Sequence, residues 1–387
     1  MKKVLIIGGG FAGCSSAEIL SHIKGVNIKI FERSDILGAG VRTHFYGGHP
    51  YTFGPRHFLT TKVETYNYLK RFLNLRNCNY HQFKSYVAQD NQFYNYPLNT
   101  KDLNKMPDKK KIFKEISKTP RKHNAKNLEE FWIRSVGKTL FSKVIKKYNE
   151  KMWMVACNKL DTFNWSPKGY TIKKGNKAAF DTHISCYPTH KDGYNKYFDL
   201  IGKLKRVKVL YKQSIKKINF KEKYIISNGK KNYFDVLINT IAPDTLFNFK
   251  FGKLKFIGRD FHKIVFPVKE VFPKNVYFLY YANNEKFTRL VEYKKFTRHK
   301  SNTTLIGMEI PSMNGKHYPI PFKSEIRKSY KYLRKLPENF FSIGRAGTYR
   351  YEVDIDDCIE QAMELVKIIN DDNYMNAFPQ QKWWQYE

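Results

Sequence analysis

Residues 4–13 read VLIIGGGFAG, and this stretch decides the fold of the chain. The apolar run at residues 4–7 predicts a buried strand, and the glycine spacing after it predicts a tight turn that opens a helix. A second apolar run, at residues 26–31, ends on Glu32, roughly twenty residues beyond the glycines, where an acid can bind ribose hydroxyls. The sequence therefore predicts a strand–turn–helix–strand unit that binds a dinucleotide.

The three glycines of this turn are predicted to have different roles. Gly8 allows the tight turn, Gly10 lets the backbone approach a pyrophosphate, and Gly13 lets the helix lie close to the strand. The predicted helix starts with Phe11 and Ala12, and the positive end of its dipole is expected to face the phosphates.

A second glycine-rich turn, Leu37-Gly38-Ala39-Gly40, follows the acid. In dinucleotide-binding flavoproteins such a turn carries the chain past the pyrophosphate toward the isoalloxazine, so we expect FAD rather than NAD. The predicted cofactor contacts at this end of the chain are Gly8, Gly10, Phe11, Ala12, Gly13, Glu32, Arg33 and Gly40.

The rest of the chain changes character twice. Apolar residues recur at three- and four-residue steps within residues 100–154, which predicts helices, and residues 261–310 are rich in aromatic and β-branched residues, which predicts antiparallel sheet. A strand at 339–343, a Gly344 turn and an apolar periodic helix close the chain. We therefore expect an α/β fold with a discontinuous Rossmann-like FAD-binding domain (1–95, 190–245 and 335–387), an inserted helical substrate-site domain (96–160) and an antiparallel β-sheet domain (161–189 and 246–334).

Composition limits the classes of function. The formal charge is +36, but the lysines are spread along the chain, so we expect no nucleic-acid partner and favour anionic membrane surfaces or anionic substrates. The five cysteines show no CxxC spacing and the histidines no ligand spacing, which argues against disulfides and a metal site. No apolar run has the length of a membrane span and no signal peptide opens the chain, so we expect a cytoplasmic protein.

Over nearly its whole length the chain resembles the UDP-galactopyranose mutase family. The most specific blocks are Thr288-Arg289-Leu290-Val291-Glu292-Tyr293-Lys294-Lys295-Phe296 and Gly344-Arg345-Ala346-Gly347-Thr348-Tyr349-Arg350-Tyr351. The resemblance implies an FAD-dependent isomerase that interconverts pyranose and furanose forms of a nucleotide sugar. It further implies that reduced flavin is the nucleophile, whose N5 displaces the nucleoside diphosphate from the anomeric carbon.

The resemblance also assigns roles to residues. Arg289 corresponds to an arginine that clamps the diphosphate, and Arg345 to a contact with the flavin. Arg289 and His57 are thus the expected catalytic residues. The expected substrate contacts are Asn99, Trp153, Lys168, Tyr194, Tyr318, Tyr351 and Asp354.

Two segments depart from the family pattern. The family has His-x-Phe-His after Gly-Pro, whereas this chain reads Arg56-His57-Phe58-Leu59. The family's second diphosphate arginine, in Arg-x-Pro-x-Arg, has only lysines as counterparts at residues 166–174. These departures predict a substrate other than UDP-galactopyranose.

Two other functions stay open from the sequence. One is an FAD-dependent oxidase or desaturase of the amine-oxidase type, and the other is a degenerate flavoprotein with a binding role. For the mutase we expect a homodimer whose product feeds capsule polysaccharide or cell-wall assembly, in peripheral association with membrane-bound glycan assembly.

Overall fold

The computed structural model describes residues 1–78, 80–120, 124–162, 172–174 and 184–370. A five-stranded parallel sheet lies at the centre of the cofactor-binding half, in the order β10-β2-β1-β14-β20. Its strands are β10 (Val207–Leu210), β2 (Val26–Phe31), β1 (Lys2–Ile7), β14 (Val236–Asn239) and β20 (Phe340–Ser342). The central strand of the sheet, β1, is covered on both faces, and residues 4–7 are therefore all apolar and buried.

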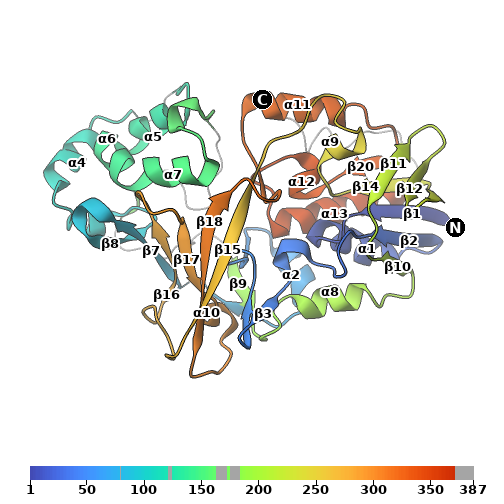
Figure 1. The fold of residues 1–387 in the computed structure, drawn as a ribbon, viewed down its shortest axis with the longest axis horizontal. Helices are drawn as coiled ribbons and strands as arrows, with labels where there is room; N and C mark the ends of the chain where they lie inside the picture. Colours follow the sequence, from blue (N-terminus) through green and yellow to red (C-terminus); the bar gives the residue numbers. More distant parts are fainter. Residues whose placement is uncertain (79, 121–123, 163–171, 175–183, 371–387) are drawn as a thin grey trace.

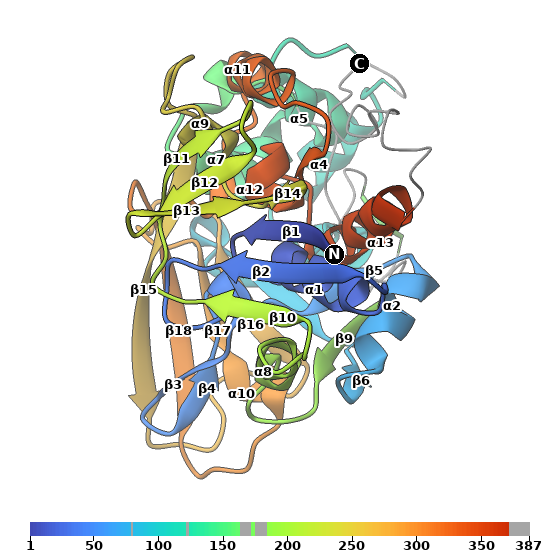
Figure 2. The same ribbon diagram turned by 90° about the vertical axis from the view of Figure 1, so that its right-hand side faces the viewer.

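Helices from both ends of the chain pack together on this sheet. Helix α1 (Phe11–Ser21) lies against β1 and β2, and α13 (Ile355–Asn370) packs on α1 (Figures 1 and 2). Because β1, β14 and β20 are neighbours although they are far apart in sequence, the predicted discontinuous Rossmann-like fold is confirmed.

A seven-stranded sheet forms the middle of the molecule in Figure 1. Its order is β19 (Tyr318–Pro319), β15 (Phe256–Phe266), β18 (Thr304–Ser312), β17 (Arg289–Glu292), β16 (Val276–Tyr281), β7 (Gln82–Val87) and β8 (Gln92–Tyr96). All pairs are antiparallel except β16 with β7, as expected for most of 261–310. Strands β7 and β8 belong to this sheet, whereas the sequence grouped 1–95 with the cofactor half. The domain boundaries themselves stay a prediction.

The predicted helical layer lies beside this sheet (Figure 1, left). It contains α3 (Thr100–Leu103), α4 (Lys109–Ile116), α5 (Leu128–Val136), α6 (Lys138–Leu140), a π-helix (Phe141–Ile145) and α7 (Lys146–Trp153). Its apolar residues form a core of their own with residues of β15 and of the segment after β19. The helical layer and the seven-stranded sheet line a cleft, and the side chains that line it come from several parts of the chain.

Smaller elements complete the fold. They are the hairpin β3 (His44–Tyr46) and β4 (His49–Tyr51), the sheet of β5 (Phe58–Thr60), β9 (Ile184–Pro188) and β6 (Leu75–Asn77), and the sheet of β11 (Ile215–Asn219), β12 (Tyr224–Ser227) and β13 (Lys230–Tyr233). The remaining α-helices of the described residues are α2 (Val63–Lys70), α8 (Asn195–Ile201), α9 (Pro243–Leu246), α10 (Tyr293–Thr297), α11 (Lys323–Leu333) and α12 (Gly344–Thr348). Within the described residues, no helix is long and apolar enough to cross a membrane.

Candidate active site

The glycine turn at residues 8–13 has the geometry that a dinucleotide needs. Gly8 has φ +99°, in the left-handed region, and a Cβ on Gly13 would lie 2.0 Å from the carbonyl oxygen of Gly8. A Cβ on Gly10, by contrast, would meet only the Cβ of Ala39, at 3.7 Å. Gly8 and Gly13 are thus required by the turn itself, whereas Gly10 leaves room for a ligand to approach the backbone.

Glu32 lies at the same turn, as its spacing predicted. Its Oε2 accepts a hydrogen bond from Gly9 N at 2.7 Å, and its Oε1 accepts from the N and Oγ of Ser34, both at 2.8 Å. The amide of Gly38 donates to the carbonyl of Gly9 at 2.8 Å, so the second glycine turn lies directly on the first. Arg33 is exposed beside Glu32.

At the start of α1 the backbone amides, and not the side chains, are suited to contact phosphates. The side chain of Phe11 is buried and stacks on Tyr197, with ring centroids 5.0 Å apart, so only its backbone can serve a ligand. A Cβ on Gly344 would lie 2.9 Å from the Cβ of Ala12, which shows that α12 closes tightly on the same helix end. The first-turn amides of α1 fit a pyrophosphate, and the Glu32 carboxylate fits a ribose.

A pocket of about 230 Å³ is lined by the helical layer, by the seven-stranded sheet and by residues from 54–59 and 345–354. It brings together seven of the residues predicted from the sequence, which come from distant parts of the chain: His57, Trp153, Arg289, Tyr318, Arg345, Tyr351 and Asp354. Leu128, Trp132 and Met152 give part of its wall an apolar character.

Two of the pocket arginines lie against the same glycine. A Cβ on Gly54 would be 3.2 Å from Nη2 of Arg289 and 3.6 Å from Nε of Arg56. Arg289 is anchored by Glu309, with 2.6 Å between Nε and Oε1, and Arg56 donates from Nε to the carbonyl of Phe53 at 2.7 Å. Each guanidinium is thus fixed through Nε while it lines the pocket.

Two further arginines lie close to the ring of Tyr318. The guanidinium carbon of Arg259 is 5.0 Å from the centre of its ring, and that of Arg345 is 5.2 Å from it. Burial alone would raise the pKa of the Tyr318 phenol, but the charges of Arg56, Arg289, Arg345 and Arg259 lower it to about 8. The lowered pKa of Tyr318 therefore reflects the positive charge of this pocket.

Aromatic rings form the wall next to Tyr318. The ring of Tyr351 packs edge-on against Trp153, at 4.9 Å between centroids, and against Tyr318, at 5.8 Å. Burial raises the pKa of Tyr351. It therefore stays a neutral phenol, able to donate a hydrogen bond, at neutral pH.

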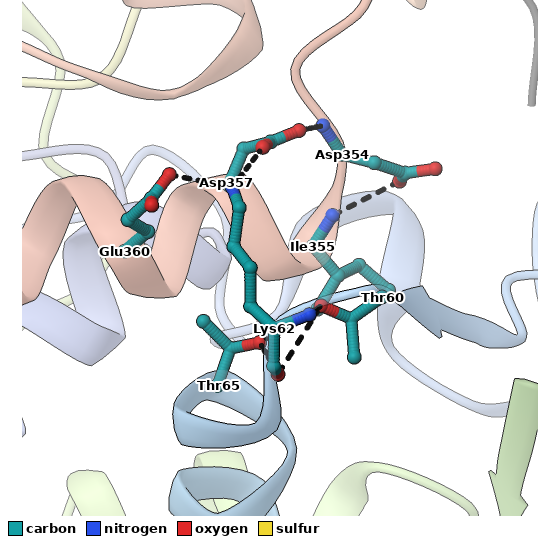
Figure 3. A network of polar contacts seen from close by, with 7 residues as sticks. All are labelled: Thr60, Lys62, Thr65, Asp354, Ile355, Asp357 and Glu360. Atoms are coloured by element: carbon teal, nitrogen blue, oxygen red, sulfur yellow. Dashed lines mark hydrogen bonds and ion pairs between the residues drawn. The ribbon is translucent and has the colours of Figure 1, made fainter. Parts of the chain in front are cut away.

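Asp354 and Arg345 are positioned by the start of α13. Arg345 donates from Nε to the carbonyl of Val353 at 2.7 Å, and its Nη2 lies 3.5 Å from Oδ1 of Asp354. Asp354 in turn donates from its amide to Asp357 at 2.9 Å, and Lys62 pairs with Asp357 at 3.0 Å and with Glu360 at 2.5 Å (Figure 3). The network joins α13 to the segment between β5 and α2.

The carboxyl of Asp356 is close to this network. Burial, with the charges of Asp357 and Asp354, raises its pKa to about 7. Asp356 therefore adds less negative charge beside the network at neutral pH than an ordinary carboxylate would.

Three predicted contacts are not found in the pocket. Asn99 is buried at the start of α3, where its Oδ1 accepts from Asp102 N at 3.0 Å, so it caps a helix and does not line the pocket. Tyr194 is fully buried and does not line the pocket. Its hydroxyl donates a hydrogen bond to the carbonyl of Arg56 at 2.9 Å, so it helps to hold the backbone of a pocket residue. Lys168 lies outside the described residues.

Two cations at the site are not among the contacts that the sequence predicts. Arg56 stands where the family has histidine. Arg259 is 8% exposed on β15, next to Tyr318. An arginine within a run that otherwise reads as a buried strand was the available signal, because such a charge needs a partner or a ligand.

The fold and the pocket define an α/β protein that has a glycine turn of the dinucleotide-binding type and an arginine-lined pocket. A family model described as UDP-galactopyranose mutase matches residues 143–351, and one for an NAD(P)-binding Rossmann-like domain matches residues 6–74. The chain belongs to the UDP-galactopyranose mutase family, and it is an isomerase of this flavin-dependent kind. The resemblance inferred from the sequence is confirmed.

Individual proteins agree with this assignment. A dTDP-fucopyranose mutase of Escherichia coli is 24% identical over 95% of this chain and 98% of its own. The crystal structure of a reduced UDP-galactopyranose mutase has the same fold, with a TM-score of 0.81 at 17% identity over 97% of this chain and 96% of that one. The fold alone is also shared with a putative protoporphyrinogen oxidase from Exiguobacterium sp. 255-15, with a TM-score of 0.72 at 13% identity over 95% and 98% of the two chains.

Proposed function

We propose that the protein interconverts the pyranose and furanose forms of a nucleoside diphosphate sugar. The observation that carries the proposal is the convergence of Arg56, Arg289 and Arg345 with Tyr318 and Tyr351 in one pocket. Reduced FAD, held by the turn at residues 8–13 and by Glu32, would supply the nucleophile that bonds transiently to the anomeric carbon of the sugar.

The charge of the pocket supports a diphosphate ligand. Arg56, Arg289 and Arg345 line the pocket, and Arg259 lies next to it against Tyr318. Two carboxylates pair with these groups, Glu309 with Arg289 and Asp354 with Arg345. This leaves an excess of two positive charges, which equals the two negative charges of a diphosphate diester. An excess of this size in a partly enclosed pocket favours an anionic ligand, because unpaired charge away from water is costly.

The residues then divide the work between the leaving group and the nucleoside. Arg289 and Arg56 bind the diphosphate and stabilise the charge that it gains when it leaves the sugar, since guanidinium binds phosphate oxygens in pairs. Tyr318 and Tyr351 donate hydrogen bonds to the same phosphates. The apolar wall formed by Leu128, Trp132 and Met152 takes the nucleoside.

We further propose that the substrate is a nucleotide sugar other than UDP-galactopyranose. The relative named above as a dTDP-fucopyranose mutase makes dTDP-fucopyranose the first candidate. The arginine at position 56, where the family has histidine, supports a changed recognition of the substrate.

The test uses the purified holoprotein reduced with dithionite. It is incubated with dTDP-fucopyranose, UDP-galactopyranose and dTDP-glucose, and pyranose and furanose forms are separated by chromatography. We expect dTDP-fucopyranose to isomerise and cyanoborohydride to trap a flavin–sugar product. Efficient isomerisation of UDP-galactopyranose would contradict the proposed change of substrate. Reduction of oxidised flavin by a substrate under anaerobic conditions would instead support an oxidase. Flavin that no sugar nucleotide perturbs would support a binding role.

We also propose that the protein acts in the cytoplasm as a homodimer and that its furanose product is used in capsule or cell-wall polysaccharide assembly. Light scattering coupled to size-exclusion chromatography tests the dimer. A monomer at all concentrations would contradict it.

A further inference from the structure

One end of the molecule gathers exposed apolar side chains. We call it the basic tip and define it as residues 44–50, 262–275 and 298–303. It carries five of the fifteen large apolar side chains that are exposed in the described part of the chain: Phe45, Tyr46, Ile264, Val268 and Val271, each 42–47% exposed. In both Figure 1 and Figure 2 the β3–β4 hairpin, the loop after β15 and the segment before β18 lie at the lower end.

The three segments of the basic tip form one surface. A Cβ on Gly47 would lie 3.0 Å from Cγ2 of Val265, and the Nζ of Lys263 lies 5.5 Å from the ring centre of Tyr46, so the hairpin lies against β15. His49 and His299 share a hydrogen bond of 2.9 Å between Nδ1 and Nε2. This bond joins the hairpin to the segment before β18.

The loop after β15 is held in a fixed shape. The amides of Val271 and Phe272 donate to the buried Glu292 at 2.9 and 2.8 Å, and Lys294 donates to the carbonyl of Lys269 at 2.8 Å. Phe272 is buried in a small core, whereas Val268 and Val271 remain exposed. The loop therefore presents its two valines to solvent although it has an apolar cluster beneath it.

The charge around these side chains has one sign. The three segments contain five lysines and arginines, Lys263, Lys269, Lys274, Arg298 and Lys300, and a single acid, Glu270. Glu270 pairs with Lys295, so its charge is neutralised within the protein. Apolar and cationic side chains thus alternate over one end of the molecule.

We propose that the basic tip binds the surface of an anionic phospholipid membrane. The apolar side chains enter the boundary between headgroups and acyl chains, and the lysines contact the anionic headgroups. Charge complementarity favours a lipid surface over a second copy of the chain, because two such tips repel each other. Apolar side chains at this site would gain nothing from a nucleic-acid backbone. The inference does not depend on the substrate of the pocket.

The experiment is co-sedimentation of the FAD-loaded protein with vesicles of phosphatidylcholine alone or with about a third phosphatidylglycerol. We expect binding to the anionic vesicles only, weakened by salt. The variant Phe45→Ser/Ile264→Ser/Val268→Ser should bind about tenfold or more weakly, since it removes the apolar anchor. Lys269→Glu/Lys274→Glu/Lys300→Glu should abolish binding.

Matched controls separate the tip from overall charge. Lys216→Glu/Lys230→Glu/Lys231→Glu makes the same change in net charge on exposed residues of β11 and β13, and Met313→Ser removes an exposed apolar side chain elsewhere. Both should bind vesicles like the unmodified protein, and all variants should keep their flavin and melting temperature. Equal losses in the two charge variants, or full binding by the triple serine variant, would overturn the proposal. Dimer dissociation by the serine variant with vesicle binding retained would also overturn it.

Discussion

The cofactor turn and the substrate pocket of this protein are built in opposite ways. The turn at residues 8–13 and its acid, Glu32, lie within thirty-two residues of the N-terminus and act through the backbone and one carboxylate. The pocket takes its side chains from segments between residues 54 and 354. A local glycine pattern can therefore predict the turn and its acid, whereas the pocket exists only after the fold has brought distant residues together.

Removing a glycine from the turn should have the largest effect. Gly13→Ala places a methyl group 2.0 Å from the carbonyl of Gly8, so the helix must move away from β1. We expect a loss of stability of about 1–3 kcal/mol and purification without flavin. Urea unfolding and flavin absorbance measure the two effects.

Gly10→Ala is the matched control for this prediction. Gly10 has φ −75° and room for a methyl group, so stability should change by less than about 1 kcal/mol. Flavin affinity should still fall, because the methyl group occupies the space where the pyrophosphate approaches. Equal stability losses in the two variants would mean that the turn does not divide its glycines between fold and ligand.

The second prediction concerns the pocket. Arg289→Met removes a guanidinium from the diphosphate and leaves the carboxylate of Glu309 buried without its partner. We expect nucleoside diphosphate affinity to fall by about 2–4 kcal/mol and the melting temperature to drop. Adding Glu309→Gln should restore the melting temperature but not the affinity, as measured by calorimetry. Recovery of both would make Arg289 a structural residue only.

Sequence and structure agree for the parts of this protein that local pattern controls. The buried strand at residues 4–7, the turn and Glu32 follow from spacing, and the motifs of the family locate Arg289, Tyr318, Arg345 and Tyr351. The four motif residues line one pocket of the fold, and their roles in binding stay a prediction.

Local pattern leaves the position of a side chain open where that side chain has two good uses. Asn99 could serve a substrate or a helix start, and the backbone amide of Asp102 is its partner in this fold. Tyr194 could face the pocket or the core, and it lies behind Arg56. Arg259 lies on a strand whose first four residues are all buried, so alternation could not show which way it faces. Only tertiary structure decides such cases.

The third prediction uses the titration of Tyr318. Below its pKa of about 8 the phenol is neutral and donates a hydrogen bond, and above it the phenolate repels the diphosphate. Nucleoside diphosphate affinity should therefore fall about tenfold from pH 7 to pH 9. Tyr318→Phe should bind more weakly at pH 7 and show no such fall.

Arg56→Gln sharpens this prediction, because Arg56 is one of the charges that lower the pKa of Tyr318. The variant should shift the fall in affinity to higher pH. The absorbance of the phenolate, taken as the difference from Tyr318→Phe, follows the same titration without ligand. A midpoint unchanged by Arg56→Gln would show that Arg56 does not act on this pocket.

The smallest effect is expected at Tyr194, which belongs to neither site but supports one of them. Tyr194→Phe keeps the ring in its place against Phe11 and removes the hydrogen bond to the carbonyl of Arg56. We expect nucleoside diphosphate affinity to fall by about 0.5–1.5 kcal/mol, with flavin binding unchanged. In an Arg56→Gln background the same substitution should have no effect on affinity, because its influence reaches the ligand only through Arg56. Additive losses in the double variant would mean that Tyr194 affects the pocket by a route other than Arg56. Residues outside both the cofactor turn and the pocket would then contribute to ligand affinity independently of Arg56.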